Sequence, residues 1–357
     1  MLKLLTLNLS KYFPFLLRGI AYQPTSIVVS LTNRCNCRCL MCNYWKFTSQ
    51  NELTTNEVKD LFNQAKAAGV SSCILYGGEP LLRKDLGELI SQAHQQGLKT
   101  EIITNGMLID EKKAKTLVAS GLDKVVISLD MCSDQLDQIR GIRGAYEKTL
   151  AALTELIKLK EQGKLEVMIA STLMLPTLRN NNLIKVIELA ERLRVPVIIQ
   201  LLDFSPLYFK GIDRKTKKEL WIAEENYPEL QLLVDKLVKI KREKKWLIVN
   251  SISSLNYTKR YFRDPRSKEL PCYVVLGGRI WIDSQGKVYL CQALPALGDL
   301  RKASFRDIVN SKRWQAGVRQ AFLKECPGCS CGYSLNVDTY LPYAWKDILI
   351  RKLSHKK

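Results

Sequence analysis

The chain has 357 residues, of which 46% are hydrophobic, so it can bury a large core and is long enough for two domains. It contains only two histidines, His94 and His355, which argues against a Ser/His hydrolase, a His-rich zinc enzyme and a His-ligated haem protein. The net charge of +20 indicates solvated basic helix faces, an anionic partner or an acidic membrane surface. No recognised nucleic-acid-binding motif accompanies this charge, so nucleic acid is not the expected partner.

The 11 cysteines include two groups, at positions 35–42 and 326–331, and are not spread along the chain as disulfide partners would be. No cleavable signal-peptide pattern precedes the first group. Grouped thiols in a reducing compartment indicate metal ligands. We therefore expect a cytoplasmic protein whose chemistry comes from a metal centre or another cofactor.

Residues 1–24 form an apolar segment that is interrupted by Pro14 and by the charges of Lys3, Lys11 and Arg18. These interruptions leave too little continuous apolar length to span a bilayer. We expect an amphipathic helix packed on the outside of the fold, with peripheral contact at a membrane surface as the alternative. Residues 336–357 form a basic tail that would suit the same contact.

Residues 25–202 predict an alternation of strands and helices. Six short runs rich in β-branched residues, typical of parallel strands buried on both faces, lie at 26–31, 72–76, 100–104, 124–128, 166–173 and 197–201. Amphipathic helical stretches lie at 55–68, 85–96, 111–120, 146–162 and 182–193, and Thr54 with Glu57 forms a capping-box pattern before the first. The expected fold class is α/β, a partial (β/α)6 TIM-like barrel, with functional groups at the carboxyl ends of the strands.

Two further regions follow the predicted barrel. Residues 203–270 are charged and predict a helical connector, with a helix around 228–244, that covers the barrel mouth. Residues 271–335 predict a small α+β domain, in which runs at 274–282 and 287–290 flank the turn residues 284–286 of a hairpin. Two short helices are expected after the hairpin, at 305–310 and 312–323.

Three cysteines in one short loop, Cys35, Cys39 and Cys42, are spaced to bind one iron–sulfur cluster directly after the first predicted strand. Iron–sulfur clusters usually take four cysteine ligands, so a loop with three leaves one iron open for an exogenous ligand. Cys37 complicates the count, because the four thiols could also form a zinc site. Cysteines two apart point to opposite sides of an extended loop, which favours the three-cysteine cluster and leaves Cys37 out.

Polar and glycine-rich segments end three of the predicted strands: YGGEP at 76–80, TNG at 104–106 and SLD at 128–130. A glycine pair at a strand end allows close backbone approach and unusual φ values. Together with the CxxxCxxC loop, these segments and the stretch 128–150, which includes Arg140-Gly141, resemble the radical S-adenosylmethionine (SAM) superfamily. The resemblance covers residues 25–335 and is weakest across the connector.

The resemblance implies a [4Fe–4S] cluster on Cys35, Cys39 and Cys42 whose open iron binds SAM. One electron from a flavodoxin- or ferredoxin-type reductant would cleave SAM, and the resulting 5′-deoxyadenosyl radical would abstract a hydrogen atom from the substrate. Gly77, Gly78 and Glu79 are implied at the methionine amino group of SAM. The full set implied to bind this cofactor is Met41, Gly77, Gly78, Glu79, Pro80, Thr104, Asn105, Gly106, Ser128 and Asp130.

The cysteines of the second group resemble the SPASM/twitch extension of radical SAM enzymes, which carries auxiliary [4Fe–4S] clusters. No cysteine follows Cys331, so the set is too small for two clusters, and one is expected, as in the shorter twitch form. The expected ligands are Cys272, Cys291, Cys326 and Cys329, with Cys331 as an alternative to one of the last two. A structural zinc ion is the alternative occupant.

Cys132 lies just after the fourth predicted strand, where the family more often has Gly-Pro. A thiol at the barrel mouth could donate a hydrogen atom to a substrate radical, as in radical SAM epimerases. Plain sequence variation is the alternative.

The substrate is less well defined by the sequence. A small polar or anionic metabolite, such as a sugar or aminocyclitol, is slightly favoured, and the resemblance would then imply dehydrogenation or epimerisation. The second expectation is peptide modification of the RiPP type, although the 34 residues before Cys35 are too few for the leader-binding domain of many peptide maturases. A lipid-linked substrate at a membrane surface is the third. A non-catalytic iron–sulfur protein that binds RNA is an alternative of another class, against which the intact cysteine loop and YGGEP argue.

Overall fold

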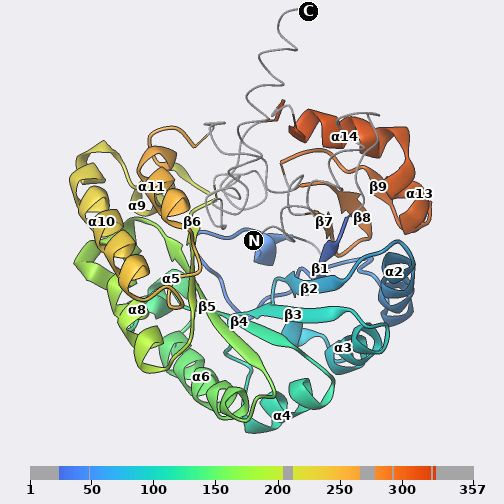
Figure 1. Ribbon diagram of the computed structural model, residues 1–357, viewed down its shortest axis with the longest axis horizontal. Helices are drawn as coiled ribbons and strands as arrows, with labels where there is room; N and C mark the ends of the chain where they lie inside the picture. Colours follow the sequence, from blue (N-terminus) through green and yellow to red (C-terminus); the bar gives the residue numbers. More distant parts are fainter. Residues whose placement is uncertain are drawn as a thin grey trace, which may run out of the picture.

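The computed structural model describes residues 24–47, 49–203, 212–265, 278–291, 293–322 and 325–326. The predicted N-terminal helix, the basic tail, and Cys272, Cys329 and Cys331 lie outside the described residues. The described strands form one nine-stranded sheet in the order β6-β5-β4-β3-β2-β1-β7-β8-β9. This sheet curves into an open arc with helices on its outer side (Figure 1).

The first six strands are parallel, each pairs with the next along the chain, and the predicted runs agree with them to within one residue at each end. They are β1 (Ser26–Thr32), β2 (Ser72–Gly77), β3 (Lys99–Thr104), β4 (Lys124–Ser128), β5 (Glu166–Leu173) and β6 (Val197–Leu201). Most of their residues are buried, as expected for strands covered on both faces. The partial barrel that the sequence predicts is confirmed.

The helices between the strands cover the outer face of the arc (Figure 1). The longer ones are α2 (Thr55–Ala67), α3 (Leu86–Gln95), α4 (Glu111–Ala119), α6 (Ala145–Glu161) and α8 (Asn182–Arg192). Two short helices, α5 (Gln135–Arg140) and α7 (Leu175–Leu178), also lie between strands in the chain. The capping box at Thr54 is present, with reciprocal bonds between Thr54 and Glu57. The sequence did not predict α5 and α7, which are too short to show a clear period.

The described part of the connector lies beside the β6 edge of the sheet rather than over the barrel mouth (Figure 1). It contains α9 (Arg214–Leu220), α10 (Tyr227–Glu243) and α11 (Ile252–Tyr261). The Asn250 side chain bonds to both the N–H and the C=O of Ile199 in β6, at 2.7 and 2.9 Å. Asn250 thus satisfies backbone groups of β6 that would otherwise be open at a sheet edge.

The C-terminal hairpin continues the barrel sheet. β7 (Arg279–Ile282) pairs in parallel with β1, while β8 (Lys287–Tyr289) and β9 (Gly298–Asp299) follow antiparallel. The two predicted helices follow as α13 (Phe305–Asn310) and α14 (Lys312–Phe322). The sequence did not predict that the hairpin shares a sheet with the barrel, because a strand pattern does not show which distant strand it will pair with.

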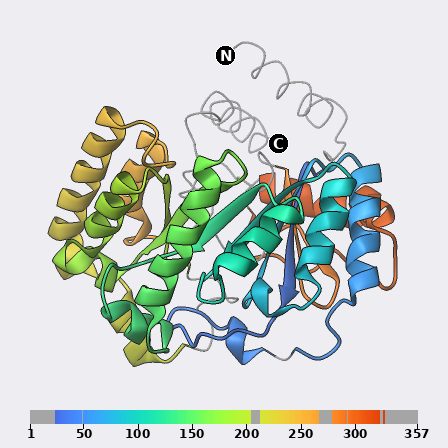
Figure 2. The same ribbon diagram turned by 90° about the horizontal axis from the view of Figure 1, so that it is seen from below.

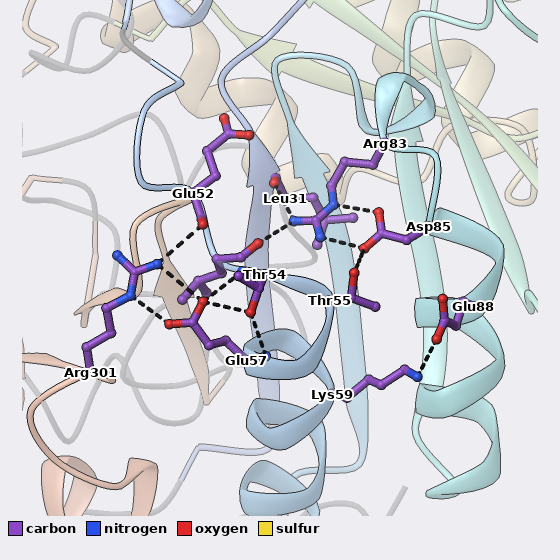
Figure 3. A network of polar contacts seen from close by, with 11 residues as sticks. Leu31, Glu52, Thr54, Thr55, Glu57, Lys59, Arg83, Asp85, Glu88 and Arg301 are labelled. Carbon is purple, nitrogen blue, oxygen red and sulfur yellow. Dashed lines mark hydrogen bonds and ion pairs between the residues drawn. The ribbon is translucent and has the colours of Figure 1, made fainter.

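Arg301, which follows β9, joins this C-terminal part to α2. Its guanidinium forms an ion pair with Glu57 at 2.7 Å (Figure 3). It also donates to the Asn51 carbonyl at 3.0 Å. The hydrogen bond from Arg301 lowers the pKa of Glu57 to about 2. Among the described helices, none is long and apolar enough to cross a membrane.

Candidate functional site

The loop that carries Cys35, Cys39 and Cys42 starts at the carboxyl end of β1 and runs along that edge of the barrel (Figure 2). Arg83 closes this loop at its base. Its Nη1 donates to the carbonyl of Leu31, before the loop, and to that of Leu53, after it, at 3.1 and 2.9 Å. Asp85 holds the same guanidinium through two bonds of 2.8 and 2.6 Å (Figure 3). A buried bidentate ion pair thus fixes both ends of the cysteine loop.

Gly77 and Gly78, at the end of β2, pack directly against the backbone of this loop. A Cβ atom on Gly78 would lie 2.2 Å from the Arg34 carbonyl oxygen, and one on Gly77 would lie 2.3 Å from that of Thr32. Gly77 also has a φ of +143°, a value that other residues rarely adopt. The two glycines therefore allow the end of β2 to pack against the backbone of the cysteine loop.

The Cys37 side chain lies between the thiols of Cys35 and Cys39. It is buried, and its sulfur also lies 3.4 Å from the Asn105 amide nitrogen and 3.6 Å from the Met107 sulfur. Hydrogen bonds from the Cys37 thiol lower the pKa of both neighbours, that of Cys39 to about 7. The same bonds raise the pKa of Cys37, and burial raises the pKa of Cys42 to about 12.

Asp130 and Arg140 form a buried ion pair beside the cysteines, with an Nη2–Oδ2 distance of 2.7 Å. Asp130 also accepts a bond from the Thr172 N–H at 2.8 Å. Burial opposes the charge on Arg140, but the Asp130 carboxylate and the Cys39 thiol raise the pKa of Arg140 above its ordinary value. The sequence assigned no role to Arg140, although the Arg140-Gly141 pair that the resemblance includes marks its position.

The end of α5 also holds the cysteine loop through its backbone. The N–H groups of Arg38 and Leu40 donate to the carbonyls of Arg140 and Ile139, at 2.8 and 2.9 Å. The loop is thus bonded at its base by a side chain and at its middle by a backbone pair. These bonds within the protein hold the loop that carries the cysteines.

Glu79 is fully buried and connects the ends of β2 and β3. Its carboxylate accepts bonds from the Thr104 hydroxyl at 2.7 Å, the Asn105 N–H at 2.9 Å and the Leu81 N–H at 3.1 Å. Burial raises the pKa of Glu79 above its ordinary value, while these three bonds act against that rise. The Glu79 carboxylate therefore hydrogen-bonds to other residues of the barrel, and a contact of Glu79 with SAM remains a prediction.

One cavity of about 220 Å³ brings most of the predicted site residues together. Its lining includes Cys35, Cys39, Met41, Cys42, Gly77, Gly78, Thr104, Asn105, Ser128 and Asp130, with Cys37 and Arg140 in addition. Glu79, Pro80 and Gly106 are not part of the lining, and lie behind it. The carboxyl ends of β2, β3 and β4 and the cysteine loop thus meet around one space, as expected of a barrel of this kind.

Cys132 does not line this cavity. The charges that act on it are those of Lys185, Glu188 and Arg192 on α8, and burial raises the pKa of its thiol to about 11. The structure therefore does not bring Cys132 together with the other predicted site residues.

The residues around the cavity fit an iron–sulfur cluster. The thiols of Cys35, Cys39 and Cys42, with that of Cys37, line one space next to the guanidinium of Arg140, which offsets thiolate charge. In the part of the chain that the structure describes, no three Cys, His, Asp or Glu side chains converge as ligands of a single metal ion.

The auxiliary cysteines are only partly described. Cys291 follows β8 and Cys326 lies beyond α14, and both are half-buried. The other expected ligands, Cys272 and Cys329, and the alternative Cys331, lie outside the described residues. The hairpin that ends at Cys291 is joined to β1, so its place relative to the barrel is set by sheet pairing.

The described fold is a partial barrel with a cysteine-lined cavity at the carboxyl ends of its strands, and known proteins share this arrangement of domains. Residues 29–194 match the family model of the radical SAM superfamily, and residues 272–331 match that of the SPASM iron–sulfur cluster-binding domain. The chain therefore contains a radical SAM domain followed by a SPASM domain. Its cofactors are accordingly a [4Fe–4S] cluster, SAM and auxiliary iron–sulfur.

Individual relatives match parts of the chain. It is 32% identical to the Fe-coproporphyrin III synthase of Methanosarcina barkeri over 60% of this chain and 52% of that protein. It is 37% identical to the PqqA peptide cyclase of Rhizobium meliloti over 36% of this chain and 35% of that protein. The chain thus spans about half or less of the length of these relatives. The crystal structure of Streptococcus suis SuiB bound to SAM has the same fold, with a TM-score of 0.66 and 16% identity over 87% of this chain and 71% of that one.

Proposed function

We propose that this protein binds a [4Fe–4S] cluster on Cys35, Cys39 and Cys42, binds SAM beside it, and abstracts a hydrogen atom from its substrate. The observation that supports this most strongly is the single cavity shared by the three cysteines and the ends of β2, β3 and β4. When bound, the cluster and SAM supply a one-electron reductive cleavage and a 5′-deoxyadenosyl radical. The chain's own residues bind and orient these groups and keep water away.

The roles of these residues follow from their contacts. Arg83 and the α5 backbone hold the cysteine loop, and Gly77 and Gly78 let β2 approach it. Arg140 is the one cationic side chain among the described residues of the cavity lining, so it balances the negative charge of thiolates and of a cofactor carboxylate. Asp130 keeps Arg140 oriented through their ion pair.

For the C-terminal domain we propose one auxiliary [4Fe–4S] cluster, held by Cys272, Cys291, Cys326 and Cys329, with Cys331 as the alternative to one of the last two. The SPASM match supports an iron–sulfur centre there. Replacing Cys291 and Cys326 together should remove about four iron atoms per chain. Iron content equal to that of the wild type would contradict the assignment.

A peptide is the substrate class we place first, ahead of the small polar metabolite favoured by the sequence. The support is that the relatives include a PqqA peptide cyclase, together with the aromatic pocket described below. A cytoplasmic location and a flavodoxin- or ferredoxin-type reductant belong to the same proposal. The segment and tail that suggested membrane contact lie outside the described residues.

The test is anaerobic reconstitution of the full chain with iron and sulfide, followed by addition of SAM and dithionite. We expect 5′-deoxyadenosine and methionine from the wild type and neither from Cys39→Ala. A wild-type protein that carries its full iron and forms no 5′-deoxyadenosine would contradict the proposal and favour the non-catalytic alternative.

A further inference from the structure

We propose that a second pocket, between the end of the barrel at β1 and β2 and the β7–β8 hairpin, binds a hydroxylated aromatic ring of the substrate. Its volume is about 360 Å³. The aromatic side chains that line it are Tyr44, Phe47, Tyr76, Trp281 and Tyr289. This inference rests on the proposed function, because it assigns the ring to the substrate of that reaction.

The pocket adjoins the cofactor cavity through two tyrosines. Tyr44 and Tyr76 line both spaces, and their hydroxyls form a hydrogen bond of 2.8 Å. Their rings meet edge to face with centroids 5.9 Å apart. A ring bound in the pocket would therefore be separated from the cofactor cavity by one pair of side chains. Binding of this ring would hold the reacting part of the same substrate near the cofactor cavity.

The aromatic rings come from three different segments of the chain. Tyr44 and Phe47 lie in the later part of the cysteine loop, Tyr76 lies near the end of β2, and Trp281 and Tyr289 face each other across the β7–β8 hairpin. Aromatic rings prefer edge-to-face or offset contacts with other aromatic rings, and such contacts add to simple burial of apolar area. A lining of this kind favours a flat, mainly apolar ligand.

Ser30 supplies the polar contact. It lies on β1, is 1% exposed, and lines the pocket, yet its hydroxyl has no hydrogen-bond partner among the described residues. Such an unpaired buried group is uncommon and calls for an explanation. A serine hydroxyl both donates and accepts, so it matches a phenolic hydroxyl on the ring.

Two charged side chains, Asp283 and Lys287, also line the pocket. Asp283 already accepts bonds from the N–H groups of Gln285 and Lys287 and from the Tyr289 hydroxyl, at 3.0, 2.9 and 3.0 Å. The part of a sugar or aminocyclitol that faced the five aromatic rings would lose hydrogen bonds to water. A single hydroxyl on a ring can instead be satisfied by Ser30.

Binding can be measured separately from SAM cleavage, by saturation-transfer NMR titration of the reconstituted holoenzyme with SAM. The probes are N-acetyltyrosinamide, N-acetylphenylalaninamide, which lacks the hydroxyl, and 4-ethylphenol, which lacks the peptide groups. We expect Ser30→Ala to weaken N-acetyltyrosinamide about 5-fold and to leave N-acetylphenylalaninamide unchanged. Phe47→Ala, at a side chain that is 41% exposed, should weaken both by about 3- to 10-fold without disturbing the core. Leu232→Ala, at a 71% exposed position on α10, is the control and should change neither.

Equal effects of Ser30→Ala on both amides, or no binding of any aromatic probe by a protein that cleaves SAM, would overturn this inference and leave the proposed function intact. Probe binding without 5′-deoxyadenosine formation would instead count against the proposed function and leave the pocket assignment standing. Tighter binding of N-acetyltyrosinamide than of 4-ethylphenol would support a peptide as the source of the ring, and equal binding would support a free phenol; either result supports the pocket.

Discussion

Gly78→Ala should disable the cysteine loop with a single methyl group. The added Cβ would lie 2.2 Å from the Arg34 carbonyl oxygen and 2.6 Å from that of Asn33. Since packed atoms do not approach closer than about 3.0 Å, the two backbones must separate by at least about 0.8 Å. Arg34 directly precedes Cys35, so the displacement falls on a ligand of the cluster.

The assay is iron and sulfide content after reconstitution, together with 5′-deoxyadenosine formation. Overpacking of this kind costs about 1–3 kcal/mol, which a domain of this size can tolerate while remaining folded. We expect about half of the iron to be lost if the auxiliary cluster remains. Formation of 5′-deoxyadenosine should fall by at least about 10-fold, because displacements near 1 Å are costly in active sites.

Gly163→Ala is the matched control. Gly163 has a φ of +70°, so alanine is strained there, but no atom lies within 4 Å of its added Cβ. The control should lose about 1–2 kcal/mol of stability and retain its iron and its activity. If Gly78→Ala kept full iron and activity, the contact between the glycine pair and the loop would not control cluster binding.

Three further changes test other parts of the structure. Arg83→Met removes the guanidinium that binds Asp85 and the two loop carbonyls, and should lower the free energy of unfolding by about 3 kcal/mol. Thermal denaturation measures this loss, with Lys59→Met, at an exposed ion pair, as the control. An equal midpoint for both variants would contradict this. The hydrogen bond from Arg301 holds the pKa of Glu57 at about 2, below its ordinary value. The stability that this carboxylate contributes is therefore present above pH 4.5 and is lost as the pH falls toward 2. The difference in thermal midpoint between wild type and Glu57→Gln should shrink below pH 4, and a constant difference would refute the linkage. Cys132→Ala should leave 5′-deoxyadenosine and product formation unchanged, since the thiol lies outside the cavity, and loss of product alone would restore the hydrogen-donor hypothesis.

The sequence predicts the barrel well because local patterns determine it. Each strand of the barrel is a short β-branched run and each long helix has an amphipathic period, so their bounds agree with the structure to within one or two residues. The strand-end motifs also meet where expected, because the carboxyl ends of parallel strands share one edge. Neighbours in the chain are neighbours in this sheet, and no long-range information is needed.

The parts that the sequence did not predict depend on contacts between distant residues. The pairing of β7 with β1 joins residues about 250 positions apart, and the sequence of neither strand indicates which strand it pairs with. The role of Arg140 depends on the short helix α5, whose six residues show no clear period. The aromatic pocket needs three segments to come together, and the unpaired hydroxyl of Ser30 cannot be recognised without the positions of its neighbours.

The pairing of β7 with β1 also has a consequence for how the chain reaches its native state. β1 is made early in synthesis, and its pairing with β2 can form soon afterwards. Its other edge must wait until residue 279 has left the ribosome, and an unpaired strand edge is prone to pair with another chain. Contacts of such long sequence separation form slowly. The free edge of β1 is therefore covered only when the C-terminal hairpin has formed. Chains that end before this hairpin should depend on chaperones to avoid aggregation.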